Sequence, residues 1–259
     1  MPVPADARRR LLAVFAHPDD ETFVAGGTLA RYAATGNEVT VVCATSGELG
    51  RRGEYVDLPR PAFADVRRGE LEAACAALGT RPPRFLGCTD KGLDHDCQEA
   101  ATAEVADIIE ELRPDVVVTF GPDGVSGHAD HLAIGQIVTA AFARAGRSLP
   151  APAPGTEHAH PVALYYVLRS EAAPACCAAR DGAPPPPPTT TSIDVRGYGD
   201  RKLAAVRCHR SQHHLQPATP EREAAILSAP EAFHRAVPAW TGGSLETHLF
   251  GLTEAATTD

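Results

Sequence analysis

Short apolar runs alternate with segments of helical periodicity along this chain. Short apolar runs bounded by turn residues are typical of buried strands, whereas apolar residues spaced three and four apart indicate helices. Strands are predicted at 11–16, 38–44, 84–88, 115–120, 162–168 and 192–195. Helices are predicted at 28–34, 63–78, 98–112, 131–144 and 200–209. Strands and helices that alternate in this way indicate an α/β fold, with a parallel sheet covered by helices on both faces.

The pattern becomes irregular after residue 146, where two segments are rich in proline and alanine. Residues 148–161 form the first segment, and residues 172–191, which contain the run Pro184 to Pro188, form the second. A proline run of this kind favours an exposed loop or linker. Because strand and helix patterns resume beyond it, we expect one domain over residues 1–259 with a Pro-rich loop insertion near 172–191.

Composition restricts the class of partner. The chain has 259 residues, of which 44% are hydrophobic and 22% charged, as in ordinary globular proteins. A net charge of -9 argues against binding to nucleic acid or to an anionic membrane, both of which attract basic surfaces. We therefore expect a small-molecule partner, no nucleic acid and no membrane, and an oligomer is compatible with the sequence.

Cysteine usage and the start of the chain predict a cytoplasmic protein. The number of cysteines is 7, which is odd, and none forms a Cys-x-x-Cys pair, so free thiols fit better than a disulfide framework. The arginines Arg8 to Arg10 precede an apolar run, as in a signal peptide, but the run is short and continues directly into His17 and acidic residues.

The first predicted strand ends in His17-Pro18-Asp19-Asp20. Polar residues at the carboxyl end of a strand lie where α/β proteins place ligands. A histidine and a carboxylate three positions apart suit a divalent metal, and an adjacent carboxylate could act as a base. Taken alone, the segment is equally consistent with a solvated turn in which Asp19 or Asp20 caps the next helix.

A second polar cluster follows the predicted strand 115–120 and contains His128 and His131. In a parallel sheet the carboxyl ends of the strands lie along one edge, so these histidines can meet His17 and Asp20 there. Two imidazoles, one carboxylate and a water are a typical catalytic zinc set. Three ligands would leave Asp19 as a base and one histidine to stabilise charge or protonate a leaving amine.

These clusters resemble the LmbE-like (PIG-L) family of zinc-dependent N-acetylglucosamine deacetylases. The resemblance rests mainly on the paired motifs Ala16-His17-Pro18-Asp19-Asp20-Glu21 and Gly127-His128-Ala129-Asp130-His131. Further similar segments are Gly26-Gly27-Thr28-Leu29, Thr45-Ser46-Gly47-Glu48, Arg67-Arg68-Gly69-Glu70-Leu71, Leu86-Gly87-Cys88-Thr89-Asp90-Lys91-Gly92 and His209-Arg210-Ser211-Gln212. The resemblance implies a Rossmann-like three-layer αβα domain with a mainly parallel sheet.

The resemblance also implies a role for each site residue. It implies His17, Asp20 and His131 as ligands of one Zn²⁺ per chain, although another divalent metal would also suit them. Asp19 is implied as the general base, and His128, oriented by Asp130, as the partner of the tetrahedral intermediate and the departing amine.

Four more residues are implied in holding the substrate: Arg67, Asp90, His209 and Gln212. The implied activity is removal of an acetyl group from the amide nitrogen of an N-acetylglucosaminyl-type substrate. An amidase for a mycothiol-like thiol conjugate is one alternative, and a non-catalytic sugar-binding module is another. Ala129 replaces the usual proline of the second motif, and Ser126 stands where mycothiol-type members often carry a tyrosine.

Overall fold

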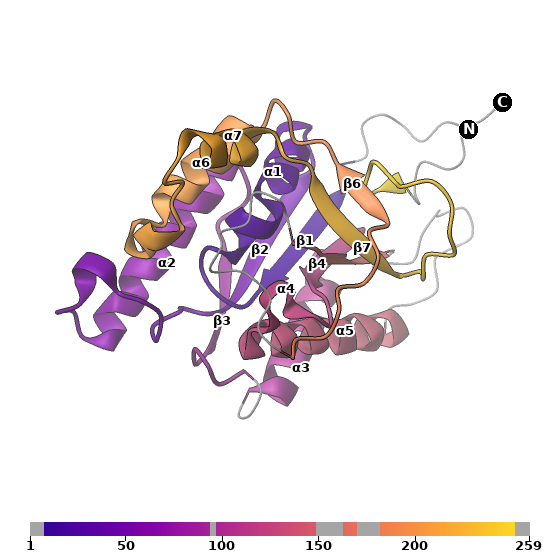
Figure 1. Ribbon diagram of the computed structural model, residues 1–259. Coiled ribbons are helices and arrows are strands. Elements are labelled where there is room, and N and C mark those ends of the chain that lie inside the picture. The colour runs from indigo at the N-terminus through magenta and orange to yellow at the C-terminus, as the bar shows by residue number, and fades with distance from the viewer. Residues whose placement is uncertain (1–7, 94–96, 149–162, 170–181, 252–259) are drawn as a thin grey trace.

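A seven-stranded sheet forms the middle of the protein, and helices cover both of its faces (Figure 1). The computed structural model describes residues 8–93, 97–148, 163–169 and 182–251. The strands are β1 (Arg10–Phe15), β2 (Glu38–Thr45), β3 (Arg84–Cys88), β4 (Val116–Phe120), β5 (Ala163–Val167), β6 (Thr191–Ile193) and β7 (Glu231–Val237). Their order across the sheet is β3-β2-β1-β4-β5-β7-β6. Strands β1 to β5 are parallel, and β7 runs antiparallel to β5 and β6.

The helices divide into two layers, as the predicted αβα arrangement requires. They are α1 (Asp20–Ala34), α2 (Arg60–Leu78), α3 (Gln98–Leu112), α4 (Gly124–Gly127), α5 (Ala129–Ser148), α6 (Gly199–Cys208) and α7 (Pro220–Ser228), with the 3₁₀ turns η1 (Gly53–Tyr55) and η3 (Arg210–Leu215). Helices α1, α2, α6 and α7 pack together on one face, and α3 packs against α5 on the other (Figure 1). The mainly parallel three-layer α/β fold is confirmed.

Strand β1 lies at the point where the strand order reverses. Leu11 of β1 is in register with Val39 of β2 on one side and with Val116 of β4 on the other. Residues 11–15 are buried on both faces, which is why the strand appears in the sequence as an unbroken apolar run. The chain passes from β1 to β2 and then to β3 on one side of β1, whereas β4 and the later strands lie on the other side. A crevice forms at such a reversal, outside the carboxyl ends of the strands.

The predicted elements of the parallel part are confirmed, but some of the later ones were missed. Strand β3 and helix α3 have the predicted bounds, whereas α1 begins at Asp20 and not at Thr28. Strand β7 was not predicted, because two of its inward positions hold Glu231 and Arg235. Polar residues at inward positions remove the apolar alternation by which a strand is recognised.

The Pro-rich insertion falls partly within the structure. Residues 149–162 and 170–181 lie outside the described residues, whereas 182–190 run to β6 without helix or strand and are mostly exposed. The part of the chain that the structure describes contains no helix long and apolar enough to cross a membrane.

The prediction that the cysteines are free thiols was wrong for one pair. Cys88 and Cys97 form a disulfide, with their Cα atoms 6.2 Å apart. Among the described residues Cys43, Cys75 and Cys208 are free thiols, as expected. The sequence did not reveal this pairing because the two cysteines are nine positions apart, a spacing typical of no metal or redox motif, and the tertiary fold brings their side chains together.

A buried ion pair attaches the last third of the chain to α1. Lys202 of α6 and Glu231 of β7 are 1% and 0% exposed, and Lys202 Nζ lies 2.6 Å from Glu231 Oε1. The Glu231 carboxylate also accepts the backbone N–H groups of Gly27 (2.9 Å) and Thr28 (2.7 Å). A Cβ atom at Gly27 would lie 2.6 Å from the Cβ of Val195, so only glycine allows this close packing.

Removing the lysine should destabilise the protein severely. Lys202→Met leaves the Glu231 carboxylate buried without its cation, and breaking such a pair costs about 3–5 kcal/mol. Urea denaturation should show this loss in the free energy of unfolding. Arg207→Ala, which removes an exposed pair with Glu223, is the control and should cost no more than about 1 kcal/mol. Equal effects of the two substitutions would contradict the structural role of the buried pair.

Candidate active site and metal centre

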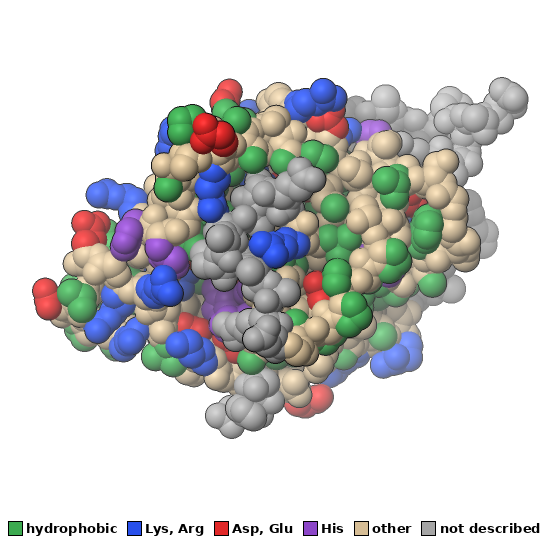
Figure 2. Space-filling view, viewed as in Figure 1, with side chains coloured by type: hydrophobic (Ala, Val, Ile, Leu, Met, Phe, Trp, Pro, Cys, Tyr) green, Lys and Arg blue, Asp and Glu red, His purple; other side chains and the backbone are tan. Residues whose placement is uncertain are grey.

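The two polar clusters meet at the carboxyl edge of the sheet, beside β1 and β4. They line a cavity of about 290 Å³. Figure 2 shows histidine side chains in the recess near the centre of this face, close to acidic side chains. The lining residues are His17, Asp19, Asp20, Gly50, Arg51, Arg67, Asp90, Lys91, Ser126, His128, His131, Gln212, His214 and Leu215. The crevice at the strand-order reversal is therefore where the predicted chemistry is located.

His17, Asp20 and His131 form a compact group of potential metal ligands. One ligand atom from each lies within 4.8 Å of the others. Asp20 stands between the two rings, with Oδ1 3.2 Å from His131 Nε2 and Oδ2 3.5 Å from His17 Nδ1. The Asp20 Oδ2 atom also accepts the backbone N–H of His17 at 2.8 Å, which fixes the turn between them.

The hydrogen bond of His131 to the backbone fits a metal ligand. Its Nδ1 lies 3.0 Å from the carbonyl oxygen of Gly124. A carbonyl oxygen can only accept, so Nδ1 carries a proton, and the neutral ring would bind a metal through Nε2. Metal-binding histidines usually donate their other ring N–H in this way, which sets the tautomer and the ring orientation. Together with a buried carboxylate, this donor set fits a divalent metal such as zinc.

Three carboxylates surround His17. Its Nε2 atom lies 2.9 Å from Asp130 Oδ2 and 3.3 Å from Asp90 Oδ1, and its Nδ1 faces Asp20. Burial alone would lower the pKa of His17, but the hydrogen bonds to these carboxylates outweigh it and raise the pKa well above the usual value. The carboxylates thus concentrate negative charge that a cation at this place would balance.

The same contacts hold the carboxylates ionised. Burial favours the neutral form of Asp20, but His131 and His17 reverse this and bring its pKa well below the usual value. Burial likewise opposes ionisation of Asp90, yet the hydrogen bond to His17 lowers its pKa to about 2. Ionised carboxylates are the form that binds metal, so this part of the site is prepared for a cation.

Asp19 behaves differently from its neighbour. Burial raises the pKa of Asp19 to about 6, although the Arg67 guanidinium opposes this rise. Its Oδ2 accepts a 2.9 Å hydrogen bond from Arg67 Nη2, and its backbone N–H donates to Glu21 Oε2 at 3.0 Å. A carboxylate that gains and loses a proton in this range suits a general base.

The backbone is strained at three strand ends around the cavity. Asp19 after β1, Lys91 after β3 and Val125 after β4 have φ values of 107°, 62° and 61°. Non-glycine residues rarely adopt this left-handed region, least of all a β-branched residue such as Val125. Strain of this kind persists only where the surrounding structure imposes it, and it is concentrated at functional sites.

His128 and Asp130 contact the metal-ligand group from the side of α5. The His128 ring centroid lies 5.0 Å from those of both His17 and His131. The backbone N–H of Asp130 donates to His128 Nδ1 at 3.2 Å, while the Asp130 carboxylate faces His17. With Nδ1 as acceptor, the proton of the neutral His128 ring is on Nε2. Asp130 therefore contacts both histidines, one through its backbone and one through its side chain.

Three of the four predicted substrate-binding residues line the cavity, and His209 does not. Arg67 is 3% exposed and donates to the Gly47 carbonyl as well as to Asp19. Gln212 donates through Nε2 to the Arg51 carbonyl at 2.9 Å. His209 is fully buried, with Nε2 2.8 Å from Glu21 Oε1. The structure thus places His209 behind Glu21, where it holds the carboxylate that accepts the Asp19 N–H.

Sequence reasoning missed Glu21 and Glu70, which connect separate motifs. Glu70 accepts both the backbone N–H and the hydroxyl of Ser211, each at 2.6 Å. Glu21 joins Asp19 to His209. Both glutamates stand inside motifs quoted for the family resemblance, but their partners lie 141 and 188 residues away. The motif positions were the only signal for them, because no local pattern specifies such distant contacts.

Several known proteins are similar to this chain in sequence. The family described as PIG-L, GlcNAc-PI de-N-acetylase, matches residues 12–142. A Rhodococcus jostii protein named 1D-myo-inositol 2-acetamido-2-deoxy-alpha-D-glucopyranoside deacetylase is 42% identical over 163 residues, which are 54% of this chain and 55% of that protein. The protein of the same name from Mycolicibacterium vanbaalenii is 36% identical over 246 residues, covering 80% of this chain and 82% of its own.

The chain spans about half the length of several of the relatives it matches. The alignments with the Rhodococcus and Thermobifida relatives span only 55% to 57% of the relatives' own length, about half of each. Activity and substrate therefore do not transfer from their names alone.

Solved structures share the fold. A hydratase, GalB from Pseudomonas putida, has a TM-score of 0.69 and 22% identity over 91% of this chain and 99% of its own. The N,N'-diacetylchitobiose deacetylase of Pyrococcus horikoshii has a TM-score of 0.64 and 20% identity over 90% of this chain and 85% of its own. Because these neighbours are named for different reactions, the fold by itself does not select one. The matched family and the long alignment with the Mycolicibacterium relative nevertheless show that the chain belongs to the PIG-L family.

Proposed function

We propose that this protein is a metal-dependent N-deacetylase that releases acetate from an N-acetylglucosaminyl-type small molecule. One observation carries the proposal: the buried Asp19 carboxylate adjoins the His17–Asp20–His131 group but does not belong to it. A binding module would need neither a buried base nor ligands held in a fixed tautomer. The family and the names of the similar proteins support the same chemistry.

Zinc is the proposed metal, with His17, Asp20 and His131 as its ligands. Imidazole and carboxylate donors in this number are typical of catalytic zinc sites, which keep a position for water or substrate. When bound, zinc acts as a Lewis acid and lowers the pKa of a coordinated water to about 7.

Asp19 is the proposed general base. Its carboxylate would take a proton from the water that attacks the acetamide carbonyl. Arg67 keeps the carboxylate in place through the 2.9 Å hydrogen bond, and burial keeps its pKa near the range in which it can accept and release a proton. The chain thus uses two adjacent aspartates for different tasks, Asp20 for the metal and Asp19 for the proton.

His128 is the proposed donor to the developing oxyanion. Its Nε2 carries the proton when Nδ1 accepts the Asp130 N–H, and His128 is one of the residues that line the cavity. A donor placed there would stabilise the tetrahedral intermediate, and His128 in its imidazolium form would give a proton to the departing amine and so return to the neutral ring. Water and the amide are converted in this way to acetate and a free amine.

Arg67, Asp90 and Gln212 are proposed to contact the sugar, because all three line the cavity. For His209 we propose an indirect contribution to substrate binding, through Glu21 and the turn that carries Asp19. The inositol-linked N-acetylglucosamine in the names of the similar proteins is the first substrate to test.

The organisation of the chain remains a further proposal. We propose that residues 1–259 form one deacetylase domain with the Pro-rich segment near 172–191 as an insertion. The cytoplasm is the proposed compartment; the free thiols of Cys43, Cys75 and Cys208 support it, and a cytoplasmic Cys88–Cys97 disulfide would be of the redox-sensitive kind.

The base assignment predicts a selective loss of rate. Asp19→Asn keeps the size of the side chain but removes its ability to accept a proton, so kcat should fall by about 10²- to 10⁴-fold. Zinc content, measured by elemental analysis, should stay at the wild-type level. Asp107→Asn, at an exposed position of α3, is the control and should keep full activity. Full activity of Asp19→Asn would exclude Asp19 as the base.

The ligand assignment predicts a loss of metal. His17→Ala and His131→Ala should each bind substoichiometric zinc, because each removes one of three protein ligands. His234→Ala is the matched control, since His234 lies on β7 and contacts the carbonyl of Pro188. Chelation should abolish wild-type activity, and added zinc should restore it. Stoichiometric zinc in both ligand variants would be incompatible with the proposed centre.

The substrate assignment is tested by the product released. Zinc-loaded protein should release acetate from 1D-myo-inositol 2-acetamido-2-deoxy-alpha-D-glucopyranoside or a related N-acetylglucosaminide. Cleavage of a thiol conjugate without release of acetate would instead identify the amidase alternative. Binding of N-acetyl sugars with no turnover by zinc-loaded protein would favour a binding module and contradict the deacetylase proposal.

A further inference from the structure

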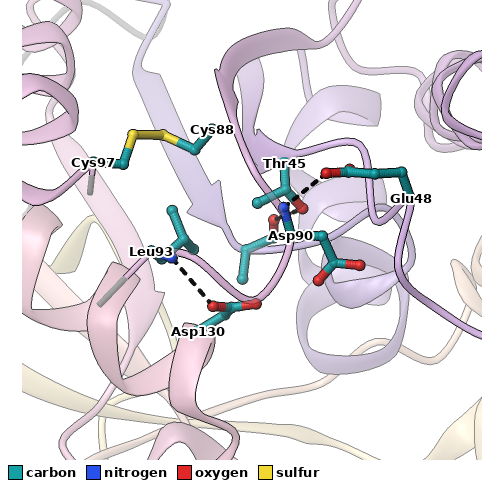
Figure 3. The surroundings of a disulfide bond; sticks show 8 residues. Thr45, Glu48, Cys88, Asp90, Leu93, Cys97 and Asp130 are labelled. Carbon is teal, nitrogen blue, oxygen red and sulfur yellow. Dashed lines mark hydrogen bonds between the residues drawn. A yellow bond between two sulfur atoms is a disulfide. The ribbon is translucent and has the colours of Figure 1, made fainter. Parts of the chain in front are cut away.

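The Cys88–Cys97 disulfide closes a short loop that reaches the active site. Cys88 is the last residue of β3, and Cys97 directly precedes α3. The segment between them includes Asp90, Lys91 and Leu93, and Figure 3 shows it lying between the disulfide and Asp130. The disulfide therefore joins the two ends of a segment that contributes residues to the cavity.

Backbone groups of this loop hold Asp130. The N–H of Lys91 donates to Asp130 Oδ2 at 2.8 Å, and the N–H of Leu93 donates to Asp130 Oδ1 at 3.4 Å. The same Oδ2 atom lies 2.9 Å from His17 Nε2. The orientation of the His17 ring thus depends on a carboxylate that the loop backbone keeps in place.

The loop also contacts His17 directly and is anchored to the segment after β2. Asp90 Oδ1 lies 3.3 Å from His17 Nε2, while Asp90 Oδ2 accepts the N–H of Leu49 at 2.8 Å. The N–H of Asp90 donates to Glu48 Oε1 at 2.9 Å (Figure 3 labels both residues). The loop therefore spans from the end of β2 to Asp130, across the end of β1.

The conformation of the loop needs an external constraint. Lys91 has a φ of 62°, which a lysine in a free loop seldom adopts. Leu93, in contrast, is fully buried and anchors the loop to the core. Joining Cys88 to Cys97 restricts the ensemble that the intervening residues can sample, which favours this one arrangement.

We propose that the Cys88–Cys97 disulfide is a redox-sensitive positioning element of the active site. The intact disulfide keeps the carboxylates of Asp90 and Asp130 in contact with His17. Reduction of the disulfide loosens the loop, so these carboxylates orient the His17 ring less strictly. The proposal rests on the proposed function for its effect on turnover, but its effect on metal affinity stands independently of the substrate.

A dithiol can supply the two electrons and two protons for reduction. A thiolate of the reductant attacks one sulfur of the disulfide, and the second thiolate of the reductant then releases the mixed disulfide. The two electrons and two protons from the dithiol leave two cysteine thiols on the protein and a disulfide in the reductant. Cys97 is half-buried and Cys88 is 7% exposed, so Cys97 is the sulfur that a reductant reaches first.

The test compares the double variant Cys88→Ser/Cys97→Ser with the wild type and with Cys208→Ser. Cys208 is a half-buried free thiol on α6 and serves as the matched control. Using the double variant avoids the binding of zinc by a dithiol reductant. Partners that orient metal-binding histidines typically change metal affinity or activity 10- to 100-fold. We expect a loss of this size in zinc affinity, measured by competition with a chelator, and in kcat/KM of the loaded enzyme.

Two further measurements separate positioning from general destabilisation. Amide hydrogen exchange at Lys91 and Leu93 should become faster in the double variant, while exchange in β1 and β4 stays unchanged. Alkylation under denaturing conditions followed by mass spectrometry should show Cys88 and Cys97 joined in the oxidised wild type.

Several results would overturn the proposal. One is the presence of free thiols at both Cys88 and Cys97 in the oxidised wild type. Others are an unchanged zinc affinity in the double variant, or a loss of zinc affinity in Cys208→Ser equal to that in the double variant. If no deacetylase substrate is found, the measurements of zinc affinity and hydrogen exchange still decide the question. A failure of the proposed function is in this way distinguishable from a failure of the disulfide proposal.

Discussion

The convergence of three carboxylates on the buried His17 ring is the constraint on which the site depends. Asp20 approaches from the start of α1, Asp90 from the loop after β3 and Asp130 from the start of α5. Negative charge collected in a buried place is unfavourable unless cationic or hydrogen-bonding partners balance it. Here the histidines and backbone N–H groups provide the balance, and a divalent cation would complete it. The arrangement is possible because the parallel sheet brings the carboxyl ends of β1, β3 and β4 to one edge.

The difference between Asp19 and Asp20 follows from their surroundings and not from their residue type. Asp20 lies between two imidazoles, which hold it ionised. Asp19 is turned away from them by a backbone with positive φ and meets a single guanidinium, so burial dominates and its pKa rises to about 6. Adjacent carboxylates with separated pKa values indicate separate chemical tasks.

The C-terminal part of the chain supports the site from behind. Lys202 and Glu231 attach α6 and β7 to α1, the helix that carries Asp20. Ser211 bonds to Glu70 of α2, and His209 bonds to Glu21 of α1. These contacts lie beyond the matched family region at residues 12–142, yet they hold the helices of that region. The last third of the chain thus packs against helices α1 and α2 through buried polar contacts.

Some features of this protein follow from its local sequence, and others follow only from its tertiary structure. Periodicity alone determined the parallel strands and most helices, because strands buried on both faces need unbroken apolar runs. The two strand-end motifs, through their resemblance to the family, predicted His17, Asp20 and His131 as metal ligands. Local sequence could not reveal β7, whose inward positions hold Glu231 and Arg235, because the partners of those side chains lie outside the strand. The Cys88–Cys97 pairing, the contact of Asp130 with His17 and the separation of the Asp19 and Asp20 pKa values were decided by tertiary structure. Each depends on distances and burial between segments far apart in the chain, which residue type and spacing do not specify.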